Sequence, residues 1–95
     1  MKATLLIRQR ERQRPGTFTE IVICRLPGSD HRYKYRMALI DQEVCVLRYD
    51  NESGRGDHRH RGAVETASQF STIEQLLEDF DADVRRYLDD HIDHR

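Results

Sequence analysis

The segment Asp57-His58-Arg59-His60 carries the residue types that most strongly suggest chemistry in this 95-residue chain. If the segment is extended, His58 and His60 lie on one side and Asp57 and Arg59 on the other. Imidazoles titrate near neutral pH, so a pair of them can act as acid and base on a phosphodiester. An arginine can stabilise the charge that develops on phosphate oxygens. The spacing therefore predicts the catalytic groups of a metal-independent ribonuclease.

Neighbouring residues are expected to complete this candidate site. Asp50 or Asp57 would orient one imidazole, while Arg48 and Arg59 would bind the scissile phosphate. Lysine and arginine along a sheet face can follow a phosphate backbone. The residues expected to guide a nucleic-acid strand are Arg32, Lys34, Arg36, Arg55 and Arg59.

Two other interpretations of the histidine segment stay open. A His-X-His pair could hold a transition metal with Asp50 or Asp57 as a third ligand. A two-metal nuclease, however, needs several converging carboxylates, and most acids of the chain lie towards its C-terminal end. We therefore expect neither a metal nor a cofactor. The segment could also be a solvated loop whose histidines only make local hydrogen bonds.

Four extended runs precede this segment and must position it. The third run, over 32–40, alternates clearly: Tyr33, Tyr35, Met37 and Leu39 point one way, and the basic residues between them point the other. The other three runs cover 3–10, 17–26 and 44–49. The links between the runs are too short for parallel crossovers, so the pattern predicts an antiparallel meander. A polar, glycine-containing loop is expected over 50–62, with a fifth strand allowed somewhere in 58–66.

The C-terminal third predicts a helix over about 72–92. Ser71 and Glu74 fit a capping box, with Ser71 as the N-cap. Apolar residues then recur at helical spacing, and aspartates are expected to fill the exposed face; the apolar positions are Ile73, Leu76, Leu77, Phe80, Val84, Tyr87, Leu88 and Ile92. The predicted fold is a single α+β domain over 1–95, with a four- to five-stranded antiparallel sheet in 1–66 and this helix packed on one face.

Composition and charge limit the function classes. No apolar run is long enough for a membrane helix or a secretory signal, so a cytoplasmic protein is expected. Cys24 and Cys45 each lie in a β-branched apolar run and are expected to be reduced core thiols.

The charges are divided unevenly along the chain. Residues 1–62 contain 13 Lys/Arg and 8 Asp/Glu, whereas residues 63–95 contain 3 Lys/Arg and 9 Asp/Glu. The basic part suggests a polyanion partner. Whether the acidic part covers it within one chain, in a homodimer, or not at all is left open by the sequence.

Three stretches of the chain resemble the TumE-like family of small bacterial toxins from type II toxin–antitoxin modules. They are Arg-Tyr-Lys-Tyr-Arg at 32–36, Val-Cys-Val-Leu-Arg-Tyr-Asp-Asn-Glu at 44–52 and Gly-Arg-Gly-Asp-His-Arg-His at 54–60. By position, the central motif of that family falls on Arg48, Tyr49, Asp50, Asn51, Gly56, Asp57, His58 and His60.

The resemblance implies a growth-inhibiting toxin encoded beside an antitoxin that resembles a helix-turn-helix DNA-binding protein. Combined with the histidine pair, it leads to the hypothesis of a metal-independent endoribonuclease acting on RNA. The alternatives are a non-catalytic module that binds nucleic acid or a protein target, and a metal-dependent nuclease or phosphotransferase.

Overall fold

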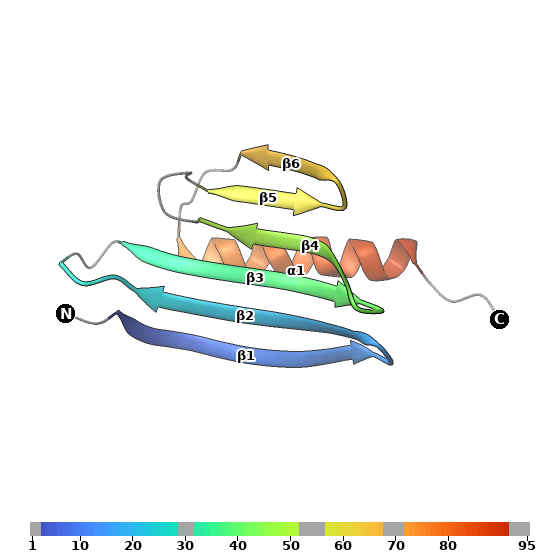
Figure 1. Ribbon diagram of the computed structural model, residues 1–95, viewed down its shortest axis with the longest axis horizontal. Helices are drawn as coiled ribbons and strands as arrows, with labels where there is room; N and C mark the ends of the chain where they lie inside the picture. Colours follow the sequence, from blue (N-terminus) through green and yellow to red (C-terminus); the bar gives the residue numbers. More distant parts are fainter. Residues whose placement is uncertain (1–2, 29–31, 52–56, 68–71, 92–95) are drawn as a thin grey trace.

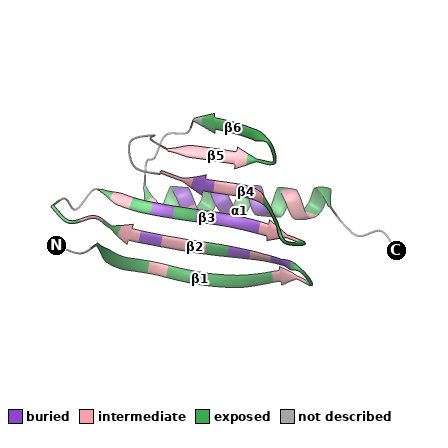
Figure 2. Cartoon of the chain, viewed as in Figure 1, coloured by how far each residue is buried: buried purple, intermediate pink, exposed green. Residues whose placement is uncertain are grey.

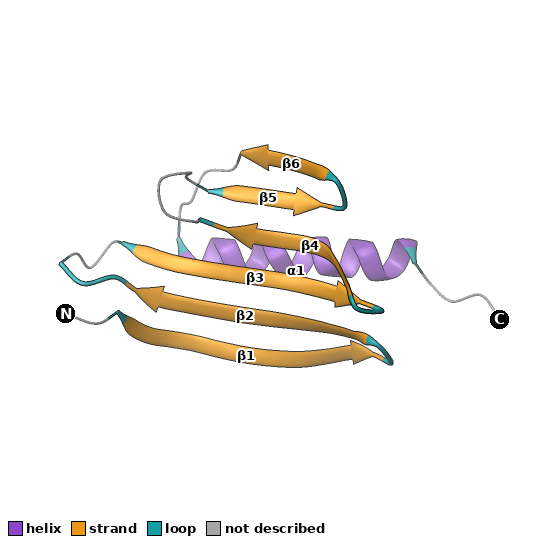
Figure 3. Cartoon of the chain, viewed as in Figure 1, coloured by secondary structure: helices purple, strands orange, loops and turns teal. Residues whose placement is uncertain are grey.

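A computed structural model describes residues 3–28, 32–51, 57–67 and 72–91 of the chain. Over these residues the chain forms one antiparallel sheet whose strands lie in sequence order, with a single helix against one face (Figure 1). The elements are β1 (Thr4–Arg14), β2 (Thr17–Arg25), β3 (Tyr33–Asp41), β4 (Val44–Asp50), β5 (His58–Arg61), β6 (Val64–Ala67) and α1 (Ile73–Asp90). The predicted α+β class, with a meander sheet and a C-terminal helix packed on it, is confirmed (Figure 3).

The strand count differs from the prediction of four to five, because residues 58–67 form a complete hairpin of two short strands. Part of the predicted loop is therefore β5, which pairs with β4 on one side and β6 on the other. Gly62, with φ +58°, lies in the two-residue turn between these strands. The four residues of β5 are all basic, so no hydrophobic alternation marks the strand in the sequence.

The long hairpins are closed by residues with positive φ. Gly16 has φ +76° in the turn between β1 and β2, and a Cβ there would overlap the side chain of Gln42. Gln42 and Glu43 both have positive φ, which gives the link between β3 and β4 the twist of a type I′ turn. The Gln42 amide N–H donates to the Gly16 carbonyl at 2.9 Å, so the two turns support each other.

The N-cap of α1 is Thr72, and the prediction of Ser71 is wrong by one residue; Ser71 itself lies outside the described residues. Thr72 has the extended backbone of a cap, and its hydroxyl accepts from the Gln75 N–H at 3.0 Å. The helix ends at Asp90, close to the predicted end, and Ile92 is outside the described residues.

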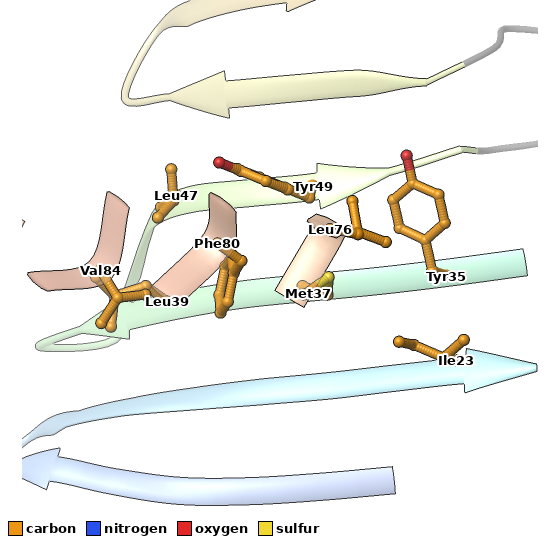
Figure 4. Close-up of a cluster of buried hydrophobic side chains, with 9 residues drawn as sticks. All are labelled: Ile23, Tyr35, Met37, Leu39, Leu47, Tyr49, Leu76, Phe80 and Val84. Atoms are coloured by element: carbon orange, nitrogen blue, oxygen red, sulfur yellow. The ribbon is translucent and has the colours of Figure 1, made fainter. Parts of the chain in front are cut away.

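The apolar stripe of α1 packs against the odd-numbered positions of the central strands. Leu76, Phe80 and Val84 are buried between the helix and the sheet (Figure 4). Their partners in the sheet are Ile23, Tyr35, Met37, Leu39, Leu47 and Tyr49. Burial is concentrated in β2, β3, β4 and α1, while β1 and β6 are largely exposed (Figure 2). The face covered by the helix is thus the one that carries Tyr35 and Met37, and not the one that carries Lys34 and Arg36.

Neither cysteine belongs to this core, contrary to expectation. Cys24 is half-buried and Cys45 is exposed, and both are free thiols. Cys24 pairs with Lys34, on the face that the helix does not cover. Cys45 lies at an irregularity of the β3–β4 pairing, where the register shifts between Leu39 and Ile40. Across the described parts of the chain, no helix is long and apolar enough to cross a membrane.

Candidate functional site

The candidate site lies on the sheet face that the helix leaves uncovered, here called the open face. Residues paired directly across an antiparallel sheet project from the same face. One row of such pairs joins Arg36 to Asp50 and Asp50 to His58. The next row joins Arg48 to His60 and His60 to Glu65. Neighbouring strands are about 4.8 Å apart, so these two rows gather six polar side chains from four strands into one cluster.

Arg48 connects the acidic and imidazole members of this cluster. Its Nη2 lies 3.2 Å from His60 Nε2, and its Nε lies 2.9 Å from Asp50 Oδ2. The Nε atom of Arg48 is buried. Among the described residues no acceptor, not even Asp50, meets hydrogen-bond geometry with its N–H. The contact with Asp50 is therefore an ion pair that leaves one buried N–H of Arg48 without an aligned acceptor. Such a donor favours binding of an additional acceptor group.

Glu65 is the member of the cluster that the sequence analysis missed. Its Oε1 lies 3.0 Å from His58 Nδ1 and 3.8 Å from His60 Nε2. The pairing of Glu65 with His60 follows from the two-residue turn at Gly62-Ala63. A hairpin centred on that glycine was the signal that could have placed Glu65 opposite the histidine segment.

The two histidines lie on the same face, as predicted from their spacing. Their ring centroids are 6.4 Å apart, and their side chains are 17% and 23% exposed, His58 being the less exposed. Both rings are therefore largely withdrawn from solvent yet accessible from the open face. A phosphodiester placed over them could reach both.

A hollow of about 320 Å³ adjoins the histidines on the same face. It is lined by Lys34, Tyr35, Arg36, Arg48 and Asp50. Three cations against one carboxylate give it a positive balance, and one of the cations is Arg48, whose Nε has no aligned acceptor among the described residues. Its chemistry fits an anion such as a phosphate.

The open face continues as a basic surface towards β1. Arg8 pairs with Val22 and Val22 with Arg36, so Arg8 shares the row of His58. Arg10 stacks over the ring of Phe18 at 4.1 Å and lies 3.9 Å from Glu20. These β1 arginines were not among the predicted nucleic-acid contacts. Among those that were, Arg32 is exposed just before β3, and Arg55 lies outside the described residues.

Asp57 and Arg59 lie apart from the histidines, on the side of the sheet that faces the helix. Asp57 accepts a hydrogen bond from the Tyr35 hydroxyl at 2.5 Å. Burial, followed by this hydrogen bond, raises the pKa of Tyr35 well above its usual value. Arg59 Nη2 donates to Asp79 at 2.8 Å, and the guanidinium lies 4.5 Å from the Tyr49 ring centroid. Like Arg48, it has a buried Nε with no aligned acceptor among the described residues.

The helix aspartates do not all face solvent, contrary to expectation. Asp83 is buried and accepts hydrogen bonds from the Tyr49 hydroxyl and from Arg61 Nη2, the latter at 2.7 Å. Asp79 receives Arg59 in the same way. Burial and the Asp83 carboxylate raise the pKa of Tyr49. Arg59 and Arg61 therefore attach β5 to the helix instead of joining the histidines.

Of the two remaining motif positions, Asn51 and Gly56, the structure describes Asn51. Asn51 accepts from the Tyr35 N–H at 2.9 Å and donates to the Tyr33 carbonyl at 2.7 Å, so its side chain extends the β3–β4 ladder. Gly56 lies outside the described residues. Within the described ranges, no group of three or more His, Cys, Asp or Glu side chains is arranged to hold a metal ion.

Comparison with known proteins gives one match. A family described as Toxin TumE matches residues 4–88, which include every strand and nearly all of the helix. Searches of curated proteins and of solved structures found no match. The family resemblance seen in the sequence is thereby confirmed.

Proposed function

Because the chain belongs to the TumE toxin family, it is a toxin, and we propose that it acts on RNA as a metal-independent endoribonuclease. The observation that carries the proposal is the pair His58 and His60 on the open face, beside a cationic hollow. Acid, base and phosphate-binding groups all lie within one small area. In this proposal they act together without a metal ion.

The proposed reaction is an internal transfer at phosphorus. One imidazole removes the proton from a ribose 2′-hydroxyl, whose oxygen attacks the adjacent phosphate. The other imidazole gives a proton to the departing 5′-oxygen, so the P–O5′ bond breaks as the P–O2′ bond forms. The products are a 2′,3′-cyclic phosphate and a 5′-hydroxyl end. The reaction requires the 2′-hydroxyl, which makes RNA and not DNA the substrate.

The hollow beside the histidines is the proposed phosphate site. Arg48, Arg36 and Lys34 offer N–H donors to the non-bridging oxygens. Asp50 holds Arg48 through its ion pair. Arg59 and Asp57 are omitted from this scheme, because their contacts with Asp79 and Tyr35 lie on the other side of the sheet. The exposed arginines of β1 extend the surface along which the strand would lie.

A toxin family implies an antitoxin, and we propose one that resembles a helix-turn-helix DNA-binding protein and meets the toxin in the cytoplasm. An antitoxin that covers the open face would block the histidines and the hollow together. The same basic face also supports a second candidate function, a module that binds nucleic acid without cleaving it. Turnover distinguishes the two.

The test is incubation of total bacterial RNA with far less than one equivalent of protein, with and without EDTA. We expect cleavage that resists EDTA and leaves cyclic phosphate ends. The double variant His58→Ala/His60→Ala should lose activity by about 10³-fold or more, since each proton-transfer group contributes about 10²- to 10⁴-fold. His91→Ala, an exposed histidine at the end of the helix, is the matched control and should cleave normally.

Each other outcome has a defined meaning. RNA left intact but retained on the protein would favour the binding module. Cleavage abolished by EDTA would favour a metal-dependent nuclease. Full activity in the double variant would eliminate the two histidines as catalytic groups. An all-deoxy copy of a cleaved oligonucleotide should remain whole.

A further inference from the structure

Strands β1 and β6 are the two outer strands of the sheet, and they differ in the length of the edge that they leave open (Figure 1). An outer strand has a row of backbone N–H and C=O groups that point away from the sheet and can pair with another strand. β6 has only four residues, and such a short edge offers little to pair with. β1 has eleven residues and, within the described parts of the chain, pairs only with β2. The free edge of β1 is therefore the longer template for an added strand.

The side chains of β1 carry positive charge on one face of the sheet. The β1–β2 register is unbroken along the middle of the strand, so Arg8, Arg10 and Arg12 all project from the open face. All three residues are exposed (Figure 2). Arg10 lies 3.9 Å from Glu20, but both side chains of this pair are largely in solvent, at 68% and 49% exposed. Among the described residues, Arg8 and Arg12 have no carboxylate at ion-pair distance. The edge therefore carries three aligned positive charges with little compensation.

These arginines determine which kind of strand fits the edge. In a continuous sheet, directly opposite residues project from the same face, so a second copy of β1 would bring arginine against arginine wherever the two segments overlap. Like charges directly opposite one another are destabilising. A strand with carboxylates at alternate positions would instead match Arg8, Arg10 and Arg12, at Cβ separations of about 4.5–5.5 Å. The edge thus disfavours a second copy of this chain and favours an acidic strand.

The start of β1 is apolar and exposed. Leu5 and Leu6 are adjacent and are 53% and 43% exposed. The register shift between Leu5 and Ile7 leaves Leu6 without a partner in β2. The other exposed large hydrophobic residues of the described parts, Val44 and Val64, lie in other strands. A strand that fits this edge would therefore be apolar at one end and acidic along the rest.

We propose that the antitoxin binds the free edge of β1 through an extended acidic segment, which adds a further strand to the sheet. Carboxylates at three alternate positions of the segment meet Arg8, Arg10 and Arg12, and apolar side chains at one end meet Leu5 and Leu6. This inference rests on the antitoxin proposed above, and not on the proposed cleavage of RNA. The β1 arginines also extend the proposed path of the RNA strand, so the segment and RNA compete for the same positive charges.

The first test measures backbone hydrogen exchange by NMR in the full chain, alone and mixed with the protein encoded beside it. In an antiparallel pair, only alternate residues direct their N–H groups towards a given neighbouring strand. We expect exchange to slow about tenfold or more at alternate residues of 7–12, those whose N–H points away from β2, and to stay unchanged in β6. A ligand that touches only side chains, as RNA would, gives no such alternation. A complex without this pattern, or the absence of any complex, would overturn the inference.

The second test reverses one charge on the edge. Arg12→Glu places a carboxylate opposite a carboxylate and should raise the Kd for the antitoxin about tenfold or more. Arg85→Glu, the same change at an exposed position of α1, is the matched control and should bind with unchanged Kd. Circular dichroism checks that both variants are folded. Equal affinity of the Arg12→Glu variant and the unmodified chain would contradict the proposed contact.

A charge swap then identifies the pair. Each acidic residue in the antitoxin segment that gains protection is changed to arginine in turn. One of these changes should restore binding to the Arg12→Glu variant and weaken binding to the unmodified chain. A protected segment without acidic residues, or restoration by none of the changes, would show that the strand is not recognised by its charges.

These results separate the inference from the proposed reaction. If the antitoxin protects alternate residues of β1 but no RNA is cleaved, the docking of the antitoxin stands and the endoribonuclease proposal fails. If RNA is cleaved through the histidines but the antitoxin binds without the alternating protection, the reaction stands and the docking inference fails.

Discussion

Alternate residues of strand β5 project from opposite faces of the sheet, and the two faces have different surroundings. His58 and His60 point to the open face, where they meet Arg48 and Glu65. Arg59 and Arg61 point to the helix, where they meet Asp79 and Asp83. The four residues are consecutive, yet the two pairs meet different residues in these two clusters. A strand with period two thus contributes to two separate polar clusters at once.

The difference between the clusters lies in how completely their charges are matched. On the helix side each arginine has a carboxylate at hydrogen-bond distance, and buried Asp83 also accepts from Tyr49. On the open face the hollow holds three cations and one carboxylate. Matched charges next to a core hold elements together, whereas an excess of one sign at an accessible hollow favours a ligand of the opposite sign. Stability and binding are therefore expected to depend on different faces.

The largest expected effect on stability comes from the core beneath the helix. Phe80 is 2% exposed and packs edge-to-face on Tyr49, with ring centroids 5.3 Å apart. Phe80→Ala should lower the free energy of unfolding by about 3–5 kcal/mol, because it leaves a cavity between α1 and β4. Urea unfolding followed by circular dichroism measures this loss. Val64→Ala, at an exposed position, should change stability by less than about 0.5 kcal/mol. Equal losses in the two variants would contradict the core assignment.

A smaller effect is expected from the helix side of β5 and would sharpen the comparison. Arg61→Ala removes one of the donors that satisfy buried Asp83, and should lower the free energy of unfolding by about 1–2 kcal/mol. The expected loss of unfolding free energy is smaller than for a fully buried ion pair, because the Arg61 side chain is 55% exposed. RNA cleavage by the folded fraction should be retained.

The matched variant on the other side of the same strand is His60→Ala. We expect a cleavage loss with a change in unfolding free energy within about 0.5 kcal/mol. If Arg61→Ala abolished cleavage in folded protein, or if His60→Ala unfolded the domain, the separation of the two faces would be wrong.

The smallest effect is expected in the acid range. A hydrogen bond from Gln75, together with Arg59, lowers the pKa of Asp79 below its usual 3.8, and a hydrogen bond from Tyr87 does the same for Asp41. Their stabilising contribution is therefore complete above the unfolded value near 3.8 and is lost as the pH falls through the lower folded values. Urea midpoints between about pH 5 and about pH 2 should decline in this window. Asp79→Asn should flatten the decline, whereas Asp81→Asn, on the exposed side of the helix, should leave it as in the unmodified protein.

The sequence by itself determined the first four strands, the helix and the two sides of β3. The alternation of β3 separates Tyr35 and Met37 from Lys34 and Arg36 through the two-residue period of a strand, and the structure has this division. The apolar spacing of α1 predicted its buried positions in the same way. The histidine segment was also identified, because its residue types are unusual whatever the fold.

Only the tertiary structure decided which face the helix covers, and therefore which charges remain accessible. The two-residue alternation of side chains defines the two faces of a strand. It does not determine which face is buried when both carry large residues. The tertiary structure also placed Glu65 beside His58, because a short polar hairpin has no hydrophobic pattern to mark its register. It placed Asp83 in the interior, since a buried carboxylate becomes acceptable only when Tyr49 and Arg61 come from distant strands to satisfy it. Contacts between residues distant in sequence determine such positions, and the local pattern of residues carries no information about these contacts.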